Sequence, residues 1–432
     1  MSTVVETPVD TTPEPGSDRP GVREGAFGNA TGLVCRECGA TQELGPHYAC
    51  LECFGPLEIA YEFPAVTREQ IEAGPANMWR YKALLPVPAD IEQSPNMEPG
   101  FTRLLKANNL GKHLGIDNLW VKDDSTNPTN SFKDRVVACA LSAATEFGSK
   151  VFACPSTGNL ANAVAAAGAR AGIKTVVFIP ANLETPKIVN SAVYTESLVA
   201  VNGNYDDVNR LASEIAGEEE GWAFVNVNVR PYYAEGSKTL GYEIAEQLGW
   251  RLPDQIVIPV ASGSQLTKVD KAFQELIKLG LVEDKPYRVF GAQATGCSPV
   301  SVAFKSGQNV VRPVKPDTIA KSLAIGNPAD GPYVLDVCRR TNGAVEDITD
   351  DEVRAGILLL ARTEGIFTET AGGTTVGVLK KLVETGQLDP TLDTVVINTG
   401  MGLKTLDAIS SQVGPAATID PTYAAFTATG IA

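Results

Sequence analysis

The sequence predicts an α/β protein with two α/β domains of parallel or mixed sheet, preceded by a short zinc-ribbon-like segment. Two observations predict the α/β domains: short apolar runs alternate with helical stretches from about residue 101 onward, and small or polar residues follow several of these runs. Four cysteines in two C-x2-C pairs predict the ribbon. Since short apolar runs are typical of strands buried on both faces, we expect helices on both sides of each sheet.

The expected strands and helices share this pattern of buried apolar runs separated by amphipathic stretches. The expected strands are Leu119–Lys122, Val151–Cys154, Thr175–Ile179, Leu198–Val201, Ala223–Val227, Ile256–Val260, Arg288–Ala292 and Thr394–Asn398. The expected helices include Val136–Phe147, Tyr205–Glu219, Gly241–Leu248, Leu266–Leu279, Asp351–Glu364 and Thr374–Glu384.

Composition and pattern together divide the chain into five parts. The proline-rich stretch 63–100 is expected to be a connector, and the acidic, Pro- and Thr-rich N-terminus is expected to be disordered. The parts are a disordered tail (1–30), the ribbon (31–62), a large α/β domain (63–150 and 240–415), a small α/β domain (151–239) and a C-terminal tail (416–432).

The charge and histidine content exclude several classes of protein. The net charge of −15 would repel nucleic acid or an anionic membrane, so we expect neither as a partner. The chain has no apolar run near the ~20 residues of a membrane helix and no secretory signal, so we expect a cytoplasmic protein. The chain has only two histidines, His47 and His113, which argues against a Ser-His-Asp hydrolase, an H-E-x-x-H protease and a multi-histidine metal enzyme. Acid–base chemistry is then left to Lys, Asp, Glu, Tyr or a cofactor.

The N-terminal cysteines form two knuckles separated by 11 residues: Cys35, Cys38, Cys50 and Cys53. Four thiolates can hold one Zn²⁺ tetrahedrally, and Gly39 and Gly55 suit the tight turns around a metal. The alternative is a ribbon-shaped fold that has lost its metal; His47, between the knuckles, is an optional ligand. The remaining cysteines are scattered and are expected to be core residues: Cys139, Cys154, Cys297 and Cys338.

Lys133 lies where a predicted strand leads into the predicted helix Val136–Phe147. We expect it in the first helical turn, with Ser131 as the N-cap. The positive end of the helix dipole disfavours an ammonium there, and a neutral, partly buried amine is what attack on an aldehyde requires. The ordinary alternative is a solvated surface lysine, so the interpretation depends on loops that converge on Lys133.

Three other predicted strands end in loops suited to a small anionic ligand, because ligands bind beyond the carboxyl ends of parallel strands. Ser156, Thr157 and Asn159 offer two hydroxyls and an amide at a helix start. The small residues of loop 261–265 let backbone N–H groups approach a phosphate, and Thr399 offers a hydroxyl after the last strand. Helix capping or a simple turn is the alternative for each loop.

A further loop, 226–238, carries side chains that could grip an anionic substrate. Asn228, Arg230 and Lys238 are the candidates, and arginine matches phosphate geometry well. As surface residues they would need no special explanation. The stretch 320–328 and the stretch 368–373 are also expected to line a site.

Four loops in chain order resemble those of the pyridoxal-phosphate enzymes of fold type II: Ser131–Arg135, Ser156–Asn159, Ala261–Gln265 and Thr399–Gly400. Within that superfamily the chain resembles the threonine synthase family from about Cys35 to about Lys404, most clearly over 122–135 and 232–239. Paired cysteine knuckles also occur in some threonine synthases. The resemblance implies the fold type II architecture, with the cofactor in the cleft between two α/β domains.

The resemblance implies a role for each matched residue. Lys133 would form a Schiff base with pyridoxal 5′-phosphate and take the substrate's Cα proton, Asn159 would hydrogen-bond the ring hydroxyl, and Thr399 would face the pyridine nitrogen. The cofactor phosphate would be held by Ala261, Ser262, Gly263, Ser264 and Gln265, although relatives have more Gly and Asn in this loop. The candidate substrate ligands are Ser156, Thr157, Asn228, Arg230 and Lys238.

The implied reaction is that of threonine biosynthesis: γ-elimination of phosphate from O-phospho-L-homoserine followed by β-hydration to L-threonine. We expect a small-molecule substrate and a homodimer. The nearest rival is a threonine or serine dehydratase, or another β-replacement enzyme of the same fold, which would not need an anion clamp. A rival from another class is a zinc-ribbon regulatory or binding protein with an inactive body.

Overall fold

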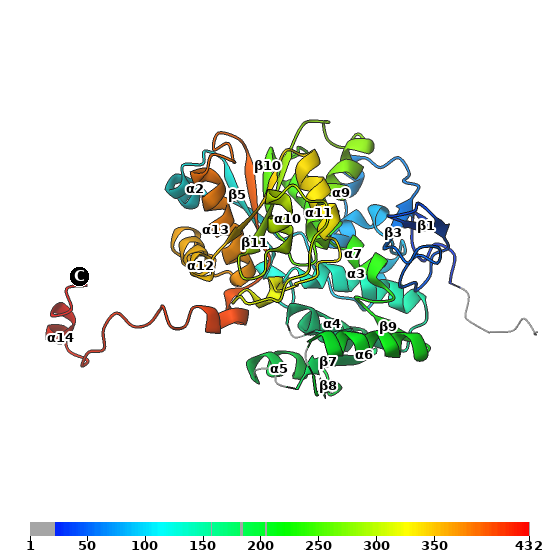
Figure 1. Cartoon of the computed structure of the whole chain (residues 1–432), viewed down its shortest axis with the longest axis horizontal. Coiled ribbons are helices and arrows are strands. Elements are labelled where there is room, and N and C mark those ends of the chain that lie inside the picture. The colour runs from blue at the N-terminus through cyan, green and yellow to red at the C-terminus, as the bar shows by residue number, and fades with distance from the viewer. Residues whose placement is uncertain (1–21, 157, 182–184, 204, 432) are drawn as a thin grey trace, which may run out of the picture.

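The computed structural model describes residues 22–156, 158–181, 185–203 and 205–431. Three sheets organise the molecule: a three-stranded antiparallel ribbon, a six-stranded sheet and a four-stranded sheet. Figure 1 shows the six-stranded sheet in the upper part of the body, the four-stranded sheet below it and the ribbon at one side. No helix in these ranges is both long enough and apolar enough to cross a bilayer.

The six-stranded sheet has the order β12-β11-β10-β13-β5-β4 and is parallel except at β4, which runs antiparallel to β5. The two edge strands were not predicted, because β4 begins and ends with basic residues and β12 contains two acidic ones, which hides the apolar pattern. The strands are β4 (Arg103–Lys106), β5 (Leu119–Asp123), β10 (Gln255–Pro259), β11 (Arg288–Ala294), β12 (Ala344–Ile348) and β13 (Thr394–Asn398).

Helices cover both faces of this sheet, as predicted. Ile256 and Ile258 of β10 belong to one apolar core, and Val257 between them belongs to the other. The first core includes α8, α9 and α11, and the second includes α12 and α13. These helices are α8 (Lys238–Gln247), α9 (Ser264–Lys278), α10 (Pro299–Lys305), α11 (Gly331–Arg340), α12 (Asp350–Glu364), α13 (Thr370–Glu384) and, near β5, α2 (Asn108–Leu114).

The four-stranded sheet has the order β8-β7-β6-β9 and is parallel throughout. The strand predicted at Ala223–Val227 was wrong at its end, because the Asn228 side chain accepts from Phe224 N and donates to Trp222 O, which turns the chain after Phe224. The elements are β6 (Val151–Pro155), α4 (Asn159–Ala171), β7 (Lys174–Pro180), α5 (Thr185–Ala192), β8 (Leu198–Val201), α6 (Tyr205–Glu218), β9 (Trp222–Phe224) and α7 (Arg230–Glu235).

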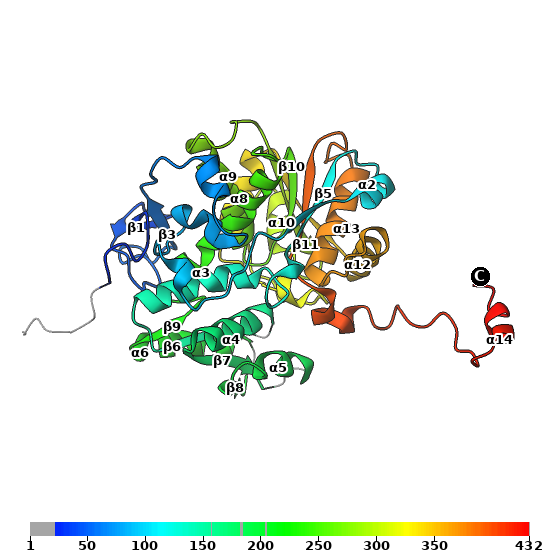
Figure 2. The same ribbon diagram turned by 180° about the vertical axis from the view of Figure 1, so that it is seen from behind.

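Helix α3 (Lys133–Glu146) joins the two α/β regions and packs against α4 and α7. Figure 2 shows α3 between the larger body and the region of the four-stranded sheet. Its first eleven residues after Lys133 are buried without interruption, so both regions cover it. The N-terminus of α3, which carries Lys133, is therefore fixed between the two sheets.

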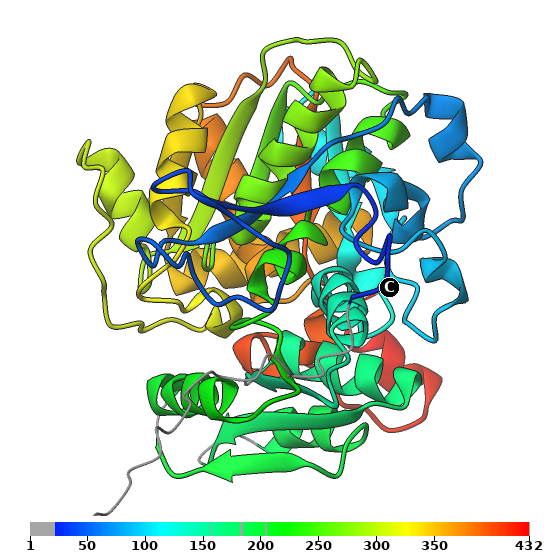
Figure 3. The same ribbon diagram turned by 90° about the vertical axis from the view of Figure 1, so that its right-hand side faces the viewer.

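The ribbon consists of β1 (Ala30–Cys35), β2 (Thr41–Gln42) and β3 (Leu57–Tyr61), with β1 paired to both others. Figure 3 shows it lying across the face of the larger body. Just before it, Phe27 is buried against Phe147 and Tyr232, so the predicted disordered tail does not extend to this residue. Most of that predicted tail, residues 1–21, lies outside the described residues.

The stretch predicted as a connector is part of the core. It forms α1 (Arg68–Glu72) and two 3-10 segments, Met78–Leu84 and Ile91–Gln93. Trp79 and Tyr81 are among the largest fully buried side chains. The connector prediction was wrong because it rested on the number of prolines, although apolar residues that can be buried lie between them.

At the other end of the chain, a segment leads away from the body to α14 (Tyr423–Thr427) (Figure 1). The predicted domain boundaries stay a prediction.

Candidate active site

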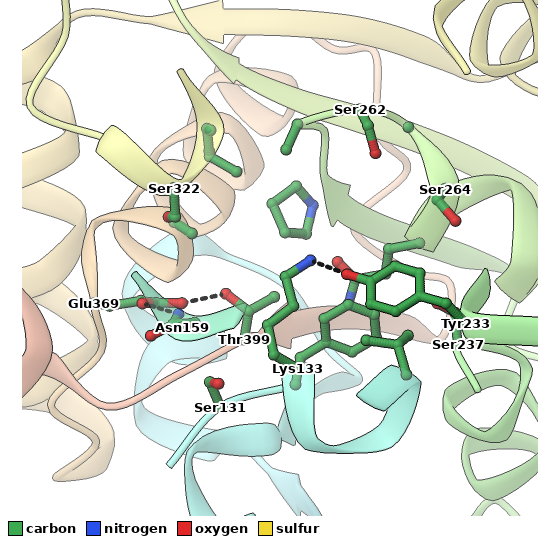
Figure 4. A pocket seen from close by; sticks show the side chains of 18 residues that line it. Ser131, Lys133, Asn159, Tyr233, Ser237, Ser262, Ser264, Ser322, Glu369 and Thr399 are labelled. Carbon is green, nitrogen blue, oxygen red and sulfur yellow. Dashed lines mark hydrogen bonds between the residues drawn. The ribbon is translucent and has the colours of Figure 1, made fainter. Parts of the chain in front are cut away.

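One pocket brings together the amine of Lys133 and the loops that were predicted to converge on it (Figure 4). The space between its lining atoms is about 600 Å³, a figure that includes open solvent at the mouth of the pocket. The lining residues come from the starts of α3, α4, α9 and α13, from the ends of β10 and β13, from α7 and the turn into α8, and from the 3-10 segment Lys321–Leu323. They are Ser131, Phe132, Lys133, Val136, Asn159, Tyr233, Ser237, Pro259, Ala261, Ser262, Gly263, Ser264, Gln265, Ser322, Leu323, Glu369, Ala371 and Thr399.

Lys133 is the first residue of α3 and, among the residues that the structure describes, the only lysine that lines this pocket. Its Nζ donates a hydrogen bond to the phenol oxygen of Tyr233 at 3.1 Å, and Figure 4 shows the two side chains meeting inside the pocket. The predicted N-cap was wrong: Phe132 holds that position without a side-chain cap, and the buried Ser131 hydroxyl has no hydrogen-bond partner in the described part of the chain.

The backbone around Lys133 is fixed to the loop that carries Thr399. Phe132 N donates to Thr399 O at 2.8 Å, and Met401 N donates to Asn130 O at 3.1 Å. On the helix side, Asp134 accepts from both the backbone N–H and the hydroxyl of Thr129 at 2.7 Å. These bonds leave the Lys133 side chain as the part that can move.

Two residues beyond the lysine, Arg135 anchors the helix start in a fully buried ion network. Its guanidinium binds Asp124 at 2.8 Å and Glu243 at 2.8 Å, and Lys122 binds the same Glu243 at 2.6 Å. Burial acts to raise the pKa of Glu243, but the charges of Arg135 and Lys122 outweigh it and hold that pKa at about 2. The network therefore fixes both the position and the ionisation of the residues behind Lys133.

Glu369 connects the two polar residues predicted to contact the cofactor ring. Asn159 Nδ2 donates to one carboxyl oxygen at 2.8 Å, and the Thr399 hydroxyl donates to the other at 2.9 Å (Figure 4). Burial raises the pKa of Glu369 above its usual value, although these two hydrogen bonds oppose the shift. The sequence indicated only the surrounding stretch 368–373 as site-lining and did not single out Glu369.

The loop 261–265 crosses from the end of β10 to the start of α9, with Gly263 as the N-cap of that helix. Gly263 has φ +102°, and a Cβ there would lie 2.7 Å from Val334 Cγ2, so only glycine fits. Backbone N–H groups at such a helix start suit a phosphate. Three buried polar atoms of pocket-lining residues, Ser131 Oγ, Ser237 Oγ and Gln265 Nε2, have no hydrogen-bond partner within the described residues. Unpaired buried donors of this kind fit a polar ligand such as pyridoxal 5′-phosphate.

The residues predicted to bind substrate are not gathered in this pocket. Ser156 is buried, and its hydroxyl accepts from Gly158 N at 3.3 Å beside Asn159; Thr157 lies outside the described residues. Arg230 forms an ion pair with Asp330 at 2.9 Å. Lys238 is fully buried and bonded to Glu235 at 2.7 Å, and it does not line the pocket. This placement argues against Lys238 as a substrate ligand.

Two polar residues of the pocket, Tyr233 and Ser237, were not among the predicted site residues. Tyr233 and Ser237 both lie within the segment 226–238 that was already suspected of binding substrate. Their position near the turn into α8 could have indicated a place in the pocket. Asn228 and Lys238 were instead predicted as substrate ligands because of their polarity or charge. Charge was misleading here because the loop's lysine neutralises buried carboxylates instead of facing the pocket.

The four N-terminal cysteines form a cluster in which the sulfur atoms all lie within 4.8 Å of one another. Tetrahedral Zn²⁺ with bonds of about 2.3 Å requires sulfur atoms about 3.8 Å apart. The sulfur pairs Cys35–Cys53, Cys38–Cys50 and Cys38–Cys53 lie 3.5, 3.7 and 3.4 Å apart, so the donor set fits zinc. His47 is not part of this cluster.

The two knuckles have the same backbone pattern. In each, the first cysteine sulfur accepts a backbone N–H from two residues later, and the fifth residue has positive φ: Gly39 at +73° and Phe54 at +60°. Gly55 serves a different purpose from the predicted turn, because a Cβ there would lie 2.9 Å from Cys35 Sγ. Backbone hydrogen bonds, chiefly from Cys38, lower the pKa of Cys35 to about 6, which favours the thiolate that a metal needs.

Sequence similarity to known proteins supports the interpretation of this pocket as a pyridoxal-phosphate site. Residues 96–400 match the family described as pyridoxal-phosphate dependent enzyme. The chain is 36% identical over 380 residues to a threonine synthase of Methanocaldococcus jannaschii, covering 87% of this chain and 93% of that protein. It is 36% identical over 378 residues to a threonine synthase of Methanosarcina acetivorans, covering 86% and 92%.

Solved structures resemble the chain in fold. Threonine deaminase isoform 2 of Solanum lycopersicum, in its processed form, superposes with a TM-score of 0.61 at 19% identity, covering 82% of this chain and 99% of that one. Maize serine racemase gives 0.59 at 20% identity, covering 72% and 91%. The predicted fold type II architecture and pyridoxal-phosphate dependence are confirmed. The chain belongs to the threonine synthase family of pyridoxal-phosphate-dependent enzymes.

Proposed function

We propose that the pocket binds pyridoxal 5′-phosphate covalently at Lys133 and converts O-phospho-L-homoserine and water to L-threonine and phosphate. The observation that carries the proposal is the meeting of one lysine amine, the loop 261–265, Asn159 and Thr399 in a single pocket. Membership of the threonine synthase family supports the substrate and the product.

The pocket residues divide into three groups by the part of the cofactor they would hold. The backbone N–H groups of 261–265, with Ser237 Oγ and Gln265 Nε2, would bind the phosphate at the start of α9. Asn159 would hydrogen-bond the ring hydroxyl, and Thr399 would face the ring nitrogen, with Glu369 holding both side chains in place. When bound, the cofactor supplies the electron sink that stabilises negative charge at the substrate's Cα and Cβ.

Lys133 would then act as the base of the reaction. Its amine, at the start of α3, would take the substrate's Cα proton and return protons to neighbouring carbons. The Tyr233 hydroxyl, 3.1 Å from Nζ, orients that amine. The buried Arg135 network and the Phe132–Thr399 hydrogen bond keep the helix start at the distance from the other loops that this chemistry requires.

The substrate would be held by groups other than Lys238. Ser156, beside Asn159 at the start of α4, suits the substrate carboxylate, and Thr157 remains a candidate from the sequence. Arg230 is retained as a weaker candidate for the substrate phosphate, because its guanidinium would have to leave Asp330. We also propose that Cys35, Cys38, Cys50 and Cys53 bind Zn²⁺ and that the protein is a cytoplasmic homodimer.

The first test is the cofactor's attachment. Purified protein loaded with pyridoxal 5′-phosphate is reduced with borohydride and digested, and the pyridoxyl label is located by mass spectrometry. We expect the label on Lys133; a label on another lysine would refute the assignment. Lys133→Ala should lose the label, whereas Lys321→Ala should keep it, because Lys321 is an exposed lysine beside the pocket residue Ser322.

The second test is the substrate. O-phospho-L-homoserine and L-threonine are supplied separately, and phosphate, L-threonine and 2-oxobutyrate are measured. We expect phosphate and L-threonine in equal amounts from the first substrate. Faster formation of 2-oxobutyrate from L-threonine would instead indicate a dehydratase.

A further inference from the structure

We propose that the four-cysteine ribbon positions the cofactor's phosphate loop, with Arg36 as the positioning residue. The ribbon lies across the face of the larger body (Figure 3). It contacts α9, whose N-terminus lines the pocket, and α11, whose N-cap residue Asp330 packs against Gly263. Metal binding at the ribbon and cofactor binding at Lys133 would then stabilise each other. This inference rests on the proposed function, because it concerns the affinity of the same pocket for pyridoxal 5′-phosphate.

The first contact runs from the first knuckle to α11. Arg36 and Glu37 are the two residues between Cys35 and Cys38. The Arg36 guanidinium lies over the Tyr333 ring, 3.4 Å from its centroid, and the Tyr333 hydroxyl donates to the Glu37 carboxylate. Both knuckle side chains therefore hold the first turn of α11.

Asp330 continues this contact to the pocket. It is the N-cap residue of α11 and is 5% exposed, and its carboxylate lies between Arg36 at 3.7 Å and Arg230 at 2.9 Å. Its backbone N–H donates to Ser262 O at 2.8 Å. A Cβ on Gly263 would lie 3.0 Å from Asp330 Cβ, so this residue is packed directly against the phosphate loop. A shift of Asp330 would move the backbone that binds the cofactor phosphate.

A second contact runs from the ribbon to α9, the helix that begins at the phosphate loop. Glu58 of β3 binds Lys268 at 3.1 Å and Lys271 at 3.2 Å, both on α9. Arg36 also binds Glu58, at 3.2 Å. Arg36 thus contacts both Glu58, which binds α9, and Asp330, which is the N-cap of α11. Its side chain is only 22% exposed, so water weakens these two ion pairs little.

The metal would determine whether Arg36 can hold this position. Four sulfur atoms within 4.8 Å are brought together by an ion that bonds to all of them, and the ion fixes the turn between Cys35 and Cys38. Without the ion, no single atom bonds to all four sulfur atoms, and the turn that carries Arg36 and Glu37 is free to open. Leu51 and Glu52, the equivalent pair in the second knuckle, are exposed, and their backbone N–H groups donate to Gln42 and to Cys50 Sγ inside the ribbon. Within the described residues no ion pair links their side chains to the larger body, so the arrangement is specific to the first knuckle.

Thermodynamic linkage gives a strict test, because two sites that stabilise each other must do so by the same factor in both directions. The dissociation constant for pyridoxal 5′-phosphate is measured from its visible absorbance with Zn²⁺-loaded and chelator-treated full-length protein. The dissociation constant for Zn²⁺ is measured by competition with a chelator, with and without the cofactor. We expect both constants to change by one common factor of about 5 to 150. Equal affinities in the two metal states would overturn the proposal.

Variants separate positioning from general loss of structure. Arg36→Ala should still bind Zn²⁺, should bind the cofactor at least about fivefold more weakly, and should bring the coupling factor close to one. Arg36→Lys, which keeps the charge but not the planar guanidinium, should restore part of the coupling. Leu51→Ala, the matched position in the second knuckle, should leave cofactor affinity and coupling unchanged. Unchanged coupling in Arg36→Ala would overturn the role of Arg36 even if metal removal unfolds the ribbon.

The phosphorus NMR signal of the bound cofactor adds a readout that altered stability alone would not move. We expect its chemical shift to differ between the wild type and Arg36→Ala, because the proposal places the change at the phosphate. An identical shift in the two proteins would contradict the proposal. Failure of the cofactor to attach to Lys133 in either metal state would refute the proposed function instead, so the two failures are distinguishable.

Discussion

The hydroxyl of Thr399 donates a hydrogen bond of 2.9 Å to Glu369, whose second carboxyl oxygen accepts from Asn159 at 2.8 Å. The hydroxyl has one proton, so while Glu369 is ionised Thr399 can only accept a hydrogen bond from a ligand in the pocket. If Glu369 is protonated, it can donate to Thr399, which can then donate to the ligand. Burial raises the pKa of Glu369 and so favours this second arrangement.

Glu369→Gln is therefore expected to keep the site working, because the amide can accept from Asn159 and donate to Thr399 as the protonated acid does. Glu369→Ala leaves both partners unpaired in a buried site, at a cost of about 1–3 kcal/mol for each. We expect the alanine variant to bind pyridoxal 5′-phosphate at least about tenfold more weakly and the glutamine variant to stay close to the wild type. Absorbance titration across pH checks this; weaker binding by Gln than by Ala would contradict it.

Tyr233→Phe removes the hydroxyl that accepts the hydrogen bond of Lys133. A hydrogen bond to a charged or reacting group is worth about 1.5–3 kcal/mol, so we expect kcat to fall about 10- to 100-fold while the cofactor stays attached to Lys133. Steady-state kinetics and the visible spectrum check the two halves of this expectation. Tyr48→Phe, an exposed tyrosine on the ribbon, is the control and should behave as the wild type. An unchanged kcat would exclude a role for Tyr233 in orienting the amine.

The sequence was sufficient to predict the site-lining loops that directly follow a buried strand. Lys133, Asn159, the loop 261–265 and Thr399 were all predicted, and all line one pocket. They could be found because parallel strands present their carboxyl ends at one edge, so residues distant in sequence become neighbours there. Their roles toward the cofactor stay a proposal.

The sequence was insufficient where tertiary contacts decide what a polar residue does. Lys238 resembled a substrate ligand but neutralises Glu235 and Glu275 in the core. Glu369 resembled a loop residue but holds two side chains of the site. Glu235 lies three positions before Lys238, but Glu275 lies 37 positions after it and Asn159 lies 210 positions before Glu369, so local sequence does not show which charges are paired in the fold.

Gly263→Ala tests the shape of the phosphate loop. The backbone there has φ +102°, and the new Cβ would lie 2.7 Å from Val334, so the loop must shift. We expect cofactor affinity to fall at least about tenfold, because strain of about 1–3 kcal/mol is imposed on the backbone that binds the phosphate. Gly249→Ala is the matched control: it has φ +78° but open space around the new Cβ. It should lower the unfolding temperature slightly and leave cofactor affinity unchanged; equal effects on affinity would exclude the loop-specific explanation.

Glu243→Gln tests the buried network behind Lys133. The pKa of Glu243 is held at about 2, below its usual value of 4.5, mainly by Arg135 and Lys122 against the opposing effect of burial. Because the folded-state pKa is lower than the unfolded one, this carboxylate stabilises the fold above about pH 4.5, and the stabilisation is lost as pH falls towards 2. Replacing it leaves Arg135 and Lys122 short of a counter-charge in the core, at a cost of about 3–5 kcal/mol at pH 7.

The expected result is a large drop in the free energy of unfolding at neutral pH and a shallower decline between pH 4.5 and 2 than in the wild type. Denaturant unfolding at a series of pH values measures both. Glu219→Gln, at an exposed glutamate just after α6, should change neither. If Glu243→Gln kept the wild-type slope in acid, the pH dependence would have to come from other carboxylates, and the network would fix Lys133 by shape alone.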